Sequence, residues 1–282
     1  MPLATTEEML KRAQEGGYAV GAFNVENMEM AQAVIWAAEE LRAPVIIQTT
    51  PSTVKYAGLD LYYANVAALA KKATVPVAMH LDHGDSFALA MQALRAGYTS
   101  VMIDGSHSVF EENIAVTKRV VDAAAPSGVP VEAELGKVGG KEDDLDGGSG
   151  GYTVPAEAKE FVERTGVSSL AVAIGTAHGV YVGEPKLDVE RVKEIRKLVS
   201  IPLVPPGASG LSDESARACI REGICKVNFA TELRIAYSDG VKAVLAEKPG
   251  VFDPKAYGKE GRERVKELVK NRMTVCGCPG KA

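Results

Sequence analysis

An aspartate and a histidine stand side by side at the end of an apolar stretch, in the segment VPVAMHLDHG. The stretch is typical of a buried strand, and Asp82 and His83 follow it directly before Gly84. A carboxylate can move a proton, and a neutral imidazole can bind a metal ion. Alternation along the strand places His80 and Asp82 on one face and His83 on the other, unless the chain turns there. The simpler alternative is a helix-capping aspartate beside a structural histidine.

Polar residues that could take part in similar chemistry follow the other predicted strands. They are Asn24, Asp104, Glu134, His178, Ser209, Asn228 and Thr231. Two histidines, His83 and His178, together with carboxylates suit a divalent transition metal such as zinc. A single histidine near an apolar strand is more often structural, and His80 and His107 fit that supporting role. The sequence therefore predicts a metal site only if these strand ends meet.

A regular alternation of short β-branched runs and longer segments of helical period makes the strand ends meet. The strand candidates are 19–23, 45–49, 75–81, 100–103, 129–135, 170–174, 201–204 and 226–229. Eight strands, each followed by a helix, predict an α/β fold of the TIM (β/α)8 barrel type, with an additional C-terminal helix over 254–271. A doubly wound open sheet is the alternative, but the first strand continues as AFNVEN without the glycine-rich turn of that fold. No linker divides the chain, so we expect one domain over residues 1–282.

One segment interrupts the alternation. Residues 136–152, GKVGGKEDDLDGGSGGY, are rich in glycine and acidic residues and have no apolar face. They follow the predicted strand that contains Glu134. Long segments of this kind within a domain are usually functional lids or disordered. We expect a mobile active-site loop.

Two glycine-rich turns, GTAHGVY and PPGASG, follow the sixth and seventh predicted strands. Barrels often bind phosphate at this position through backbone N–H groups and a helix N-terminus. A metal, a phosphate site and a carboxylate together suit cleavage of a carbon–carbon bond next to a carbonyl, through a metal-stabilised enediolate. A Schiff-base mechanism would need a lysine at a strand end, but Lys226 begins its strand.

Composition excludes several other classes of protein. The 282 residues are 46% hydrophobic and 24% charged with a net charge of −5, which is ordinary for a globular enzyme and does not favour a nucleic-acid partner. No apolar run is long enough to cross a membrane, and the charged N-terminus does not resemble a signal peptide. Four cysteines are too few for a disulfide framework, so we expect a cytoplasmic protein. Cys276 and Cys278 form a C-x-C that is either a metal site or part of a frayed terminus.

Motifs along nearly the whole chain resemble the class II, metal-dependent ketose-bisphosphate aldolases, and above all the tagatose-bisphosphate branch. These motifs are GAFNVENME, HLDHGDSF, VMIDGSH, VEAELGKVGGKED, IGTAHGVY, PGASGLSDE and KVNFATELRIAYS. The resemblance implies a TIM-barrel lyase of carbohydrate metabolism, such as glycolysis. It would reversibly cleave a tagatose- or fructose-type ketose 1,6-bisphosphate to dihydroxyacetone phosphate and glyceraldehyde 3-phosphate. It also implies a zinc or other divalent ion, room for a monovalent cation, and a homodimer or homotetramer.

The resemblance assigns roles by position. Asp82 would exchange a proton on the C4 hydroxyl side of the substrate, and Glu142 would handle the proton of the dihydroxyacetone phosphate half. The implied metal-binding residues are His83, His178, Glu134 and Asp104. The implied substrate and phosphate-binding residues are Asn24, Gly179, Gly207, Ser209, Asn228 and Thr231. Ala230 resembles the tagatose type.

Two departures from the family pattern leave alternatives open. Pro206 stands where the family has a third zinc-binding histidine, and Val182 replaces a lysine that assists phosphate binding. Glu134 can complete a set of two histidines and one carboxylate, which often holds divalent metals other than zinc. The alternatives are an aldolase for another phosphorylated sugar, including one that lacks a phosphate, and a sugar-phosphate-binding relative with impaired catalysis.

Overall fold

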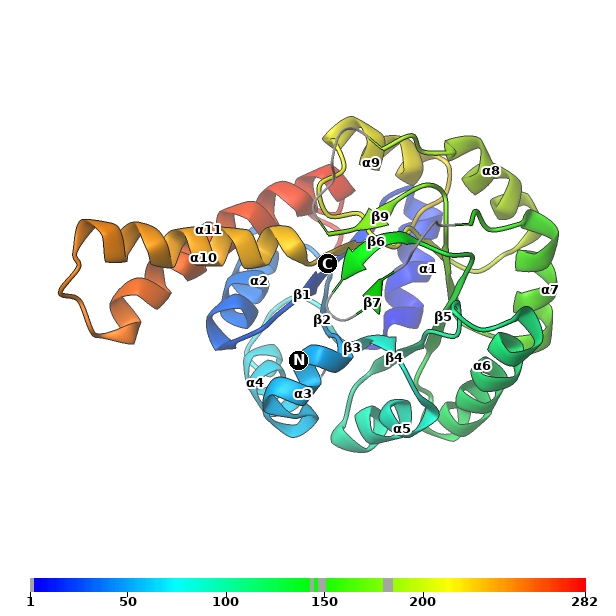
Figure 1. The fold of residues 1–282 in the computed structure, drawn as a ribbon, viewed down its shortest axis with the longest axis horizontal. Helices are drawn as coiled ribbons and strands as arrows, with labels where there is room; N and C mark the ends of the chain where they lie inside the picture. The colour runs from blue at the N-terminus through cyan, green and yellow to red at the C-terminus, as the bar shows by residue number, and fades with distance from the viewer. Residues whose placement is uncertain (1–2, 143–144, 147–150, 180–184) are drawn as a thin grey trace.

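Eight parallel strands form the centre of the protein, in a computed structural model that describes residues 3–142, 145–146, 151–179 and 185–282 (Figure 1). Their order is β10-β8-β5-β4-β3-β2-β1-β11. The strands are β1 (Val20–Asn24), β2 (Val45–Thr49), β3 (Val77–Gly84), β4 (Ser100–Ile103), β5 (Val131–Leu135), β8 (Ser169–Val172), β10 (Leu203–Val204) and β11 (Lys226–Phe229). Next to β11, the N–H of Cys225 donates to the carbonyl of Leu203 over 2.9 Å, which joins the two ends of the sheet. The predicted TIM barrel is confirmed.

Helices surround the barrel (Figure 1). They are α2 (Met28–Leu41), α3 (Pro51–Ala57), α4 (Leu59–Ala70), α5 (Phe87–Ala96), α6 (Phe110–Ala124), α7 (Pro155–Thr165), α8 (Val189–Leu198), α9 (Asp213–Arg221) and α10 (Thr231–Glu247), with a short 3-10 turn at Ala125–Ser127. Side-chain caps fix several starts: Asn27 accepts from the N–H of Met30, and Ser212 accepts from that of Ser215. Such caps satisfy N–H groups that lack partners within the helix. The strand-to-helix turns are thereby held at defined positions around the mouth.

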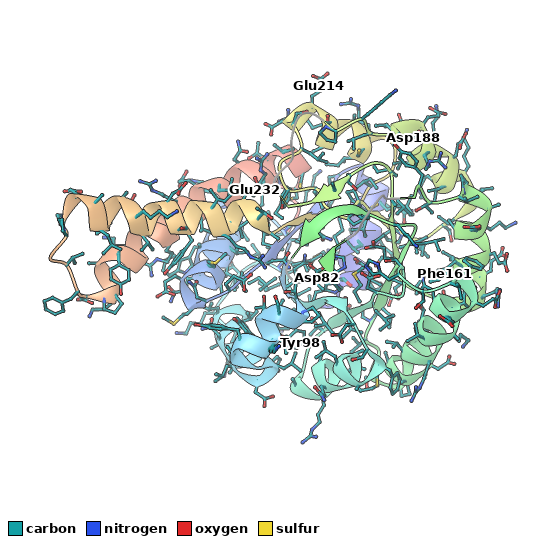
Figure 2. All side chains as sticks on the ribbon, viewed as in Figure 1. Asp82, Tyr98, Phe161, Asp188, Glu214 and Glu232 are labelled. Atoms are coloured by element: carbon teal, nitrogen blue, oxygen red, sulfur yellow. The ribbon has the colours of Figure 1, made fainter. Side chains whose placement is uncertain are left out.

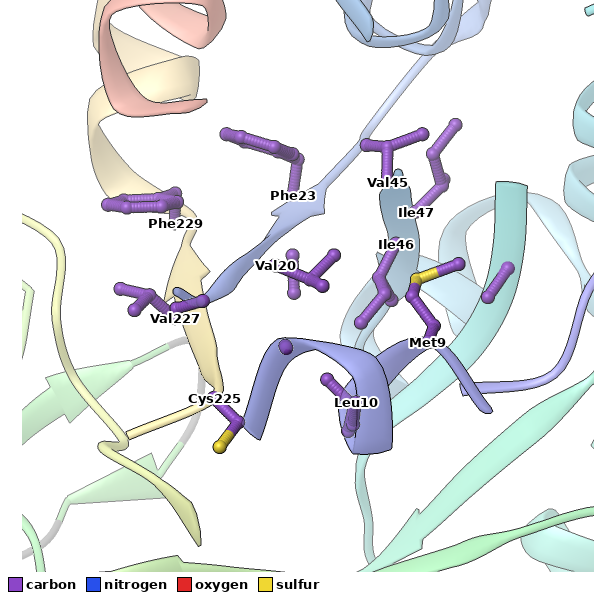
Figure 3. Packing of buried hydrophobic residues seen from close by; sticks show 14 of the residues in the cluster. Met9, Leu10, Val20, Phe23, Val45, Ile46, Ile47, Cys225, Val227 and Phe229 are labelled. Atoms are coloured by element: carbon purple, nitrogen blue, oxygen red, sulfur yellow. The ribbon is translucent and has the colours of Figure 1, made fainter. Parts of the chain in front are cut away.

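The N-terminal end of the barrel is covered by α1 (Thr6–Gly16), a helix where the sequence alone indicated only a charged amphipathic stretch. Figure 3 shows Met9 and Leu10 of this helix packed beneath Val20 and Ile46 of the barrel strands. The N–H of Ala4 donates to the carbonyl of Val77 at the start of β3. Solvent is therefore excluded from the closed end of the barrel.

The C-terminal helix is longer than predicted and runs from Pro254 to Cys276 as α11. With α10 it forms a hairpin that projects away from the barrel (Figure 1). The idea of a frayed terminus is wrong, because Cys276 and Cys278 are buried and the N–H of Gly280 donates to the carbonyl of Leu41. Burial raises the pKa of both thiols, as expected of structural cysteines.

The predicted loop over 136–152 contains two short strands, β6 (Gly139–Glu142) and β7 (Leu145–Asp146). They pair with each other, and β6 also pairs with β9 (Ala177–His178). The three strands form a small second sheet that lies in front of the barrel in the view of Figure 1. Residues 143–144 and 147–150 lie outside the described residues. The mobility of the loop stays a prediction. Of the helices that the structure describes, none combines the length and apolarity needed to cross a bilayer.

Candidate active site

The end of β3 departs from a regular strand. The strand continues past Leu81 to Gly84, which pairs with Ile103 of β4. The register of this pairing shifts between Leu81 and Gly84. His83 within this bulge has a left-handed φ of 48°. Bulges re-aim side chains and are frequent next to active sites. As a result Asp82 and His83 both line the mouth cavity, although regular alternation would have put them on opposite faces.

Gly84 is required by this arrangement, because a side chain there would collide with the backbone carbonyl of Met102 on β4. The close approach lets the carbonyl of Gly84 accept a 2.9 Å hydrogen bond from the N–H of Asp104. The bulge therefore places Asp104 next to His83. Gly84 is the last residue of the strand.

Asp82 lies near the centre of the barrel (Figure 2) and is 2% exposed. Its Oδ2 accepts hydrogen bonds from Nδ2 of Asn24 (2.9 Å) and Nε2 of Gln48 (3.1 Å). The same Nε2 of Gln48 lies 2.8 Å from Oδ1 of Asn24. Oδ1 of Asp82 is buried and has no hydrogen-bond partner among the described residues. The carboxylate is thus held by one oxygen, and the other is free to act on a substrate.

His83 and Asp104 form a buried pair, with 2.8 Å between Nδ1 and Oδ2. Burial alone lowers the pKa of His83, but the nearby carboxylates of Asp82, Asp104 and Glu134 outweigh it and raise that pKa well above its ordinary value. Burial opposes ionisation of Asp104, yet the bonds from His83 and from the N–H of Ser106 hold its pKa low. A carboxylate on one ring nitrogen is the usual support of a metal-binding histidine.

Glu134 completes the cluster. It is 2% exposed, and its Oε2 is buried without a hydrogen-bond partner among the described residues. Burial and the neighbouring carboxylate of Asp104 raise the pKa of Glu134 well above its ordinary value. One ligand atom each of His83, Asp104 and Glu134 lie within 4.8 Å of one another. An imidazole and two carboxylates fit a divalent cation, which would also satisfy the orphaned oxygen of Glu134.

Part of the predicted metal and proton-transfer set comes together at the mouth. Three of the four predicted metal ligands lie side by side, whereas the side chain of His178 lies outside the described part of the structure. Its backbone in β9 pairs with Gly140 of β6. The side chain of Glu142, at the end of β6, is likewise outside the described residues, as is the whole of Val182. Pro206 is buried and offers no ligand atom.

All six predicted substrate and phosphate-binding residues line one cavity together with Asp82 and His83. They are Asn24, Gly179, Gly207, Ser209, Asn228 and Thr231. Gly179 and Gly207 have left-handed φ values of 86° and 64°, which only glycine adopts without strain. The α10 helix begins at Thr231 and no described side chain caps it. Its first N–H groups and positive dipole end suit a phosphate.

Ser209 and Asn228 shape the wall between this cavity and the strands. Oγ of Ser209 accepts a 2.9 Å hydrogen bond from the N–H of Ala230, which links the turn after β10 to the start of α10. Oδ1 of Asn228 is buried without a partner among the described residues, like the free oxygen of Asp82. Unsatisfied buried polar atoms that surround one cavity are typical of a site shaped for a polar ligand.

Gln48 is the residue of this site that sequence reasoning missed. It is fully buried on β2, between the strands of Asn24 and Asp82. A signal was present in the strand VIIQT, where an amide breaks an otherwise apolar run near its C-terminal end. Parallel barrel strands present their functional residues at that end.

Comparison with known proteins agrees with this geometry. Residues 4–281 match the family model described as "Fructose-bisphosphate aldolase class-II". The crystal structure of the YdjI aldolase from Escherichia coli K12 is 42% identical over 99% of both chains, with a TM-score of 0.89. That of a putative fructose-1,6-biphosphate aldolase from Coccidioides immitis is 33% identical over 97% of this chain and 96% of the other, also with a TM-score of 0.89.

A third structure shares the fold. The fructose-bisphosphate aldolase from Campylobacter jejuni is 23% identical over 100% of this chain and 97% of its own, with a TM-score of 0.84. Such identity supports the barrel alone, whereas the family match and the two more similar structures extend over the residues of the mouth. The chain therefore belongs to the class II fructose-bisphosphate aldolase family, whose members are metal-dependent aldehyde-lyases.

Proposed function

We propose that this chain reversibly cleaves a ketose 1,6-bisphosphate of the tagatose or fructose type to dihydroxyacetone phosphate and glyceraldehyde 3-phosphate. One observation carries the proposal. The free oxygen of Asp82 shares a cavity with the phosphate-type turns at Gly207 and Ser209, beside the His83, Asp104 and Glu134 cluster. Proton transfer, anion binding and a metal are what cleavage next to a carbonyl requires.

Asp82 is the proton-transfer residue on the C4 hydroxyl side of the substrate. Asn24 and Gln48 both donate to its Oδ2, so rotation of the carboxylate would break two hydrogen bonds, and Oδ1 is left for the substrate. In the cleavage direction this oxygen takes the hydroxyl proton while the C3–C4 bond breaks and the aldehyde forms. In the reverse direction it returns the proton. Glu142 is proposed to exchange the proton of the dihydroxyacetone phosphate half.

His83 and Glu134, with His178, are proposed to hold the divalent metal, and Asp104 orients His83 through the 2.8 Å bond to Nδ1. When bound, the metal acts as a Lewis acid on the substrate carbonyl. Pro206 supplies no third imidazole, so Glu134 takes that place in the donor set. Two imidazoles and a carboxylate accept zinc, manganese and cobalt.

The phosphate of the dihydroxyacetone half is proposed to bind at Gly179, Gly207 and Ser209, and Thr231 at the start of α10 belongs to the second phosphate region. Asn228 contacts the substrate through its free Oδ1. Ala230 supports a tagatose-type sugar. Val182 supports a second candidate, an aldolase whose substrate lacks one of the two phosphates.

The test is cleavage of tagatose and fructose 1,6-bisphosphates, and of ketose 1-phosphates, with zinc, manganese, cobalt or no added metal. We expect metal-dependent release of dihydroxyacetone phosphate, abolished by Asp82→Asn. Cleavage of the 1-phosphates alone would favour the second candidate. Sugar-phosphate binding without cleavage under any metal would favour a binding protein that has lost catalysis, and would overturn the proposal.

A homodimer or homotetramer is also proposed. The α10–α11 hairpin projects from the barrel (Figure 1) and carries Phe252, which is 91% exposed, beyond Leu245, which is 40% exposed. We infer that these side chains pack against a second copy of the chain. Light scattering on the wild type and on Phe252→Ser tests this: an oligomer that the substitution weakens is expected, and a monomeric wild type would contradict it.

A further inference from the structure

A second polar layer lies inside the barrel, beneath the mouth. Its centre is Lys226, which begins β11 and is completely buried. The Nζ of Lys226 lies 2.8 and 3.0 Å from the two carboxylate oxygens of Glu132 and 3.3 Å from Nε2 of His80. An ammonium group has three donors and no acceptor, so these three contacts use all of its hydrogen-bonding capacity.

The lysine also fixes the proton of His80. Since Lys226 can only donate, Nε2 of His80 must accept, and the ring proton lies on Nδ1. That nitrogen is 2.8 Å from Oγ of Ser100, which also accepts a 2.9 Å hydrogen bond from Thr6 of α1. On the other side, Ser169 donates to Glu132 over 3.1 Å. Hydrogen bonds therefore run without a break from β11 through His80 and Ser100 to the helix that closes the barrel.

Burial of such charged and polar groups costs free energy of folding. Barrel interiors are usually filled by branched apolar side chains, and a buried ion pair is often no more stabilising than well-packed hydrophobic residues. Its presence in this barrel needs a reason other than stability. The position of its members provides one.

The three residues stand on strands spread around the barrel. In the sheet order, β2 and β1 separate β3 from β11, β10 and β8 separate β11 from β5, and β4 separates β5 from β3. Hydrogen bonds from one ammonium group thus join three sides of the cylinder. A change in the height of any of these strands would lengthen at least one of the bonds.

Each of the three also lies two residues before a residue of the mouth. Side chains at positions i and i+2 of a strand point to the same face. Glu132 therefore lies beneath Glu134 on β5. On β3, His80 pairs in register with Gln48 of β2, which donates to Asp82, so His80 and Asp82 also lie on one face, with His80 beneath Asp82. Lys226 lies in the same way beneath Asn228. The lower layer and the proposed site are two successive levels of the same three strands.

We propose that Lys226 is a positioning residue for this site: with Glu132 and His80 it fixes the relative heights of β3, β5 and β11. It thereby sets the separation of Asp82, Glu134 and Asn228. The inference rests on the proposed function of the mouth. A displacement of about 1 Å in a catalytic group can cost about 100-fold in rate, so small shifts of these strands matter.

The test compares Lys226→Met with the double variant Lys226→Met/Glu132→Leu. The single variant leaves a buried carboxylate without its cation and is expected to be less stable. The double variant removes both charges and should recover part of the lost urea midpoint, because His80 and Ser169 still lose their partners. We expect kcat for retro-aldol cleavage to remain about 100-fold low in both, with KM changed much less. The d–d absorption of bound cobalt is expected to shift in the double variant, because Glu134 has moved.

Ile47→Val is the matched control, since Ile47 is buried in β2 and by alternation with Gln48 points away from the interior. It should lower the urea midpoint and leave kcat and the cobalt spectrum unchanged. A stable double variant with the kcat of the wild type would overturn the positioning role. An inactive wild type would instead overturn the proposed function, so the two failures are distinguishable. If Lys226→Met does not fold, the double variant carries the test.

Discussion

Asn24 and Asp82 lie on strands that are separated by one strand of the barrel, and Nδ2 of Asn24 is 2.9 Å from Oδ2 of Asp82. Gln48, on the strand between them, donates to both residues. Three neighbouring strands thus each contribute one polar side chain to a single hydrogen-bonded group. Among the described residues, only Asn24 and Gln48 hold the Asp82 carboxylate by hydrogen bonds. Both bonds are to Oδ2, and Oδ1 stays free.

Gln48→Met removes both donated bonds and keeps the length of the side chain. We expect kcat to fall about 10- to 100-fold, because Asp82 loses its fixed orientation. The free energy of unfolding should fall by about 1–3 kcal/mol. The control is Gln32→Met, since Gln32 accepts from Arg262 of the hairpin and is not among the residues that line the mouth cavity. Equal effects of the two substitutions on kcat would contradict the orienting role of Gln48.

Removal of the carboxylate behind His83 is expected to weaken metal binding. Asp104→Asn should lower the affinity for zinc or cobalt about 10- to 100-fold, as for other carboxylates that support a metal-binding histidine. Glu134→Gln should lower it further, because Glu134 is proposed as a direct ligand. Competition with a chromophoric chelator measures both. Asp188→Asn serves as the control, since Asp188 caps α8 and pairs with Arg191. Unchanged affinity in Glu134→Gln would exclude that residue from the metal.

Stability of the metal-free protein should decrease as the pH rises through neutrality. The pKa of His83 is raised in the folded state above its ordinary 6.5, and that of Glu134 above its ordinary 4.5. Each group therefore stabilises the fold below its unfolded pKa, and this contribution is lost as the pH rises through the folded pKa. The contribution of Asp104 to stability has the opposite pH dependence. Because its pKa is lowered in the folded state, Asp104 stabilises the fold above its ordinary pKa of 3.8, and this stabilisation is lost on acidification.

Urea midpoints of the metal-free protein between about pH 5 and pH 9 measure this dependence. We expect a decline from about pH 6.5 upward that is reduced in His83→Gln and offset when a divalent metal is added. Below about pH 6.5 the lowered pKa of buried His80 acts in the opposite direction, so the test lies above that pH. A midpoint that rises with pH above about 6.5 in the metal-free wild type would contradict the raised pKa values of His83 and Glu134.

Ser209→Ala tests the phosphate region. Loss of the hydroxyl leaves the N–H of Ala230 without its 2.9 Å partner and removes the proposed donor to the phosphate. We expect KM to rise about tenfold, which corresponds to roughly 1.4 kcal/mol, with a smaller change in kcat. Ser212→Ala is the control, because Ser212 caps α9 and its loss should lower stability without altering KM. An unchanged KM in Ser209→Ala would place the phosphate elsewhere.

The strands and most helices could be predicted because each has a local cause. Periodic apolar runs define Val45–Thr49 and Lys226–Phe229, and Ser212 marks the start of α9. The polar residues at strand ends could be collected for the same reason. Eight parallel strands bring their C-terminal ends to one mouth whatever the details of packing.

The rest depends on contacts that no local pattern records. The bulge at His83 arises where β3 meets β4, so the side-chain direction of that residue could not be taken from alternation. Lys226 was judged only by its place at the start of a strand, whereas its role follows from Glu132, 94 residues away in sequence. The burial of Cys278 follows from packing of the terminus, and the sequence alone left that segment ambiguous.

The most direct test of the central claim uses dihydroxyacetone phosphate alone, because every proposed sugar substrate yields this product. Proton NMR in deuterium oxide follows the exchange of one carbon-bound hydrogen of dihydroxyacetone phosphate, without any aldehyde present. We predict exchange that requires a divalent metal, is retained in Asp82→Asn and is lost in Glu142→Gln. Absence of exchange in the wild type with zinc, manganese and cobalt would contradict the proposed aldolase activity.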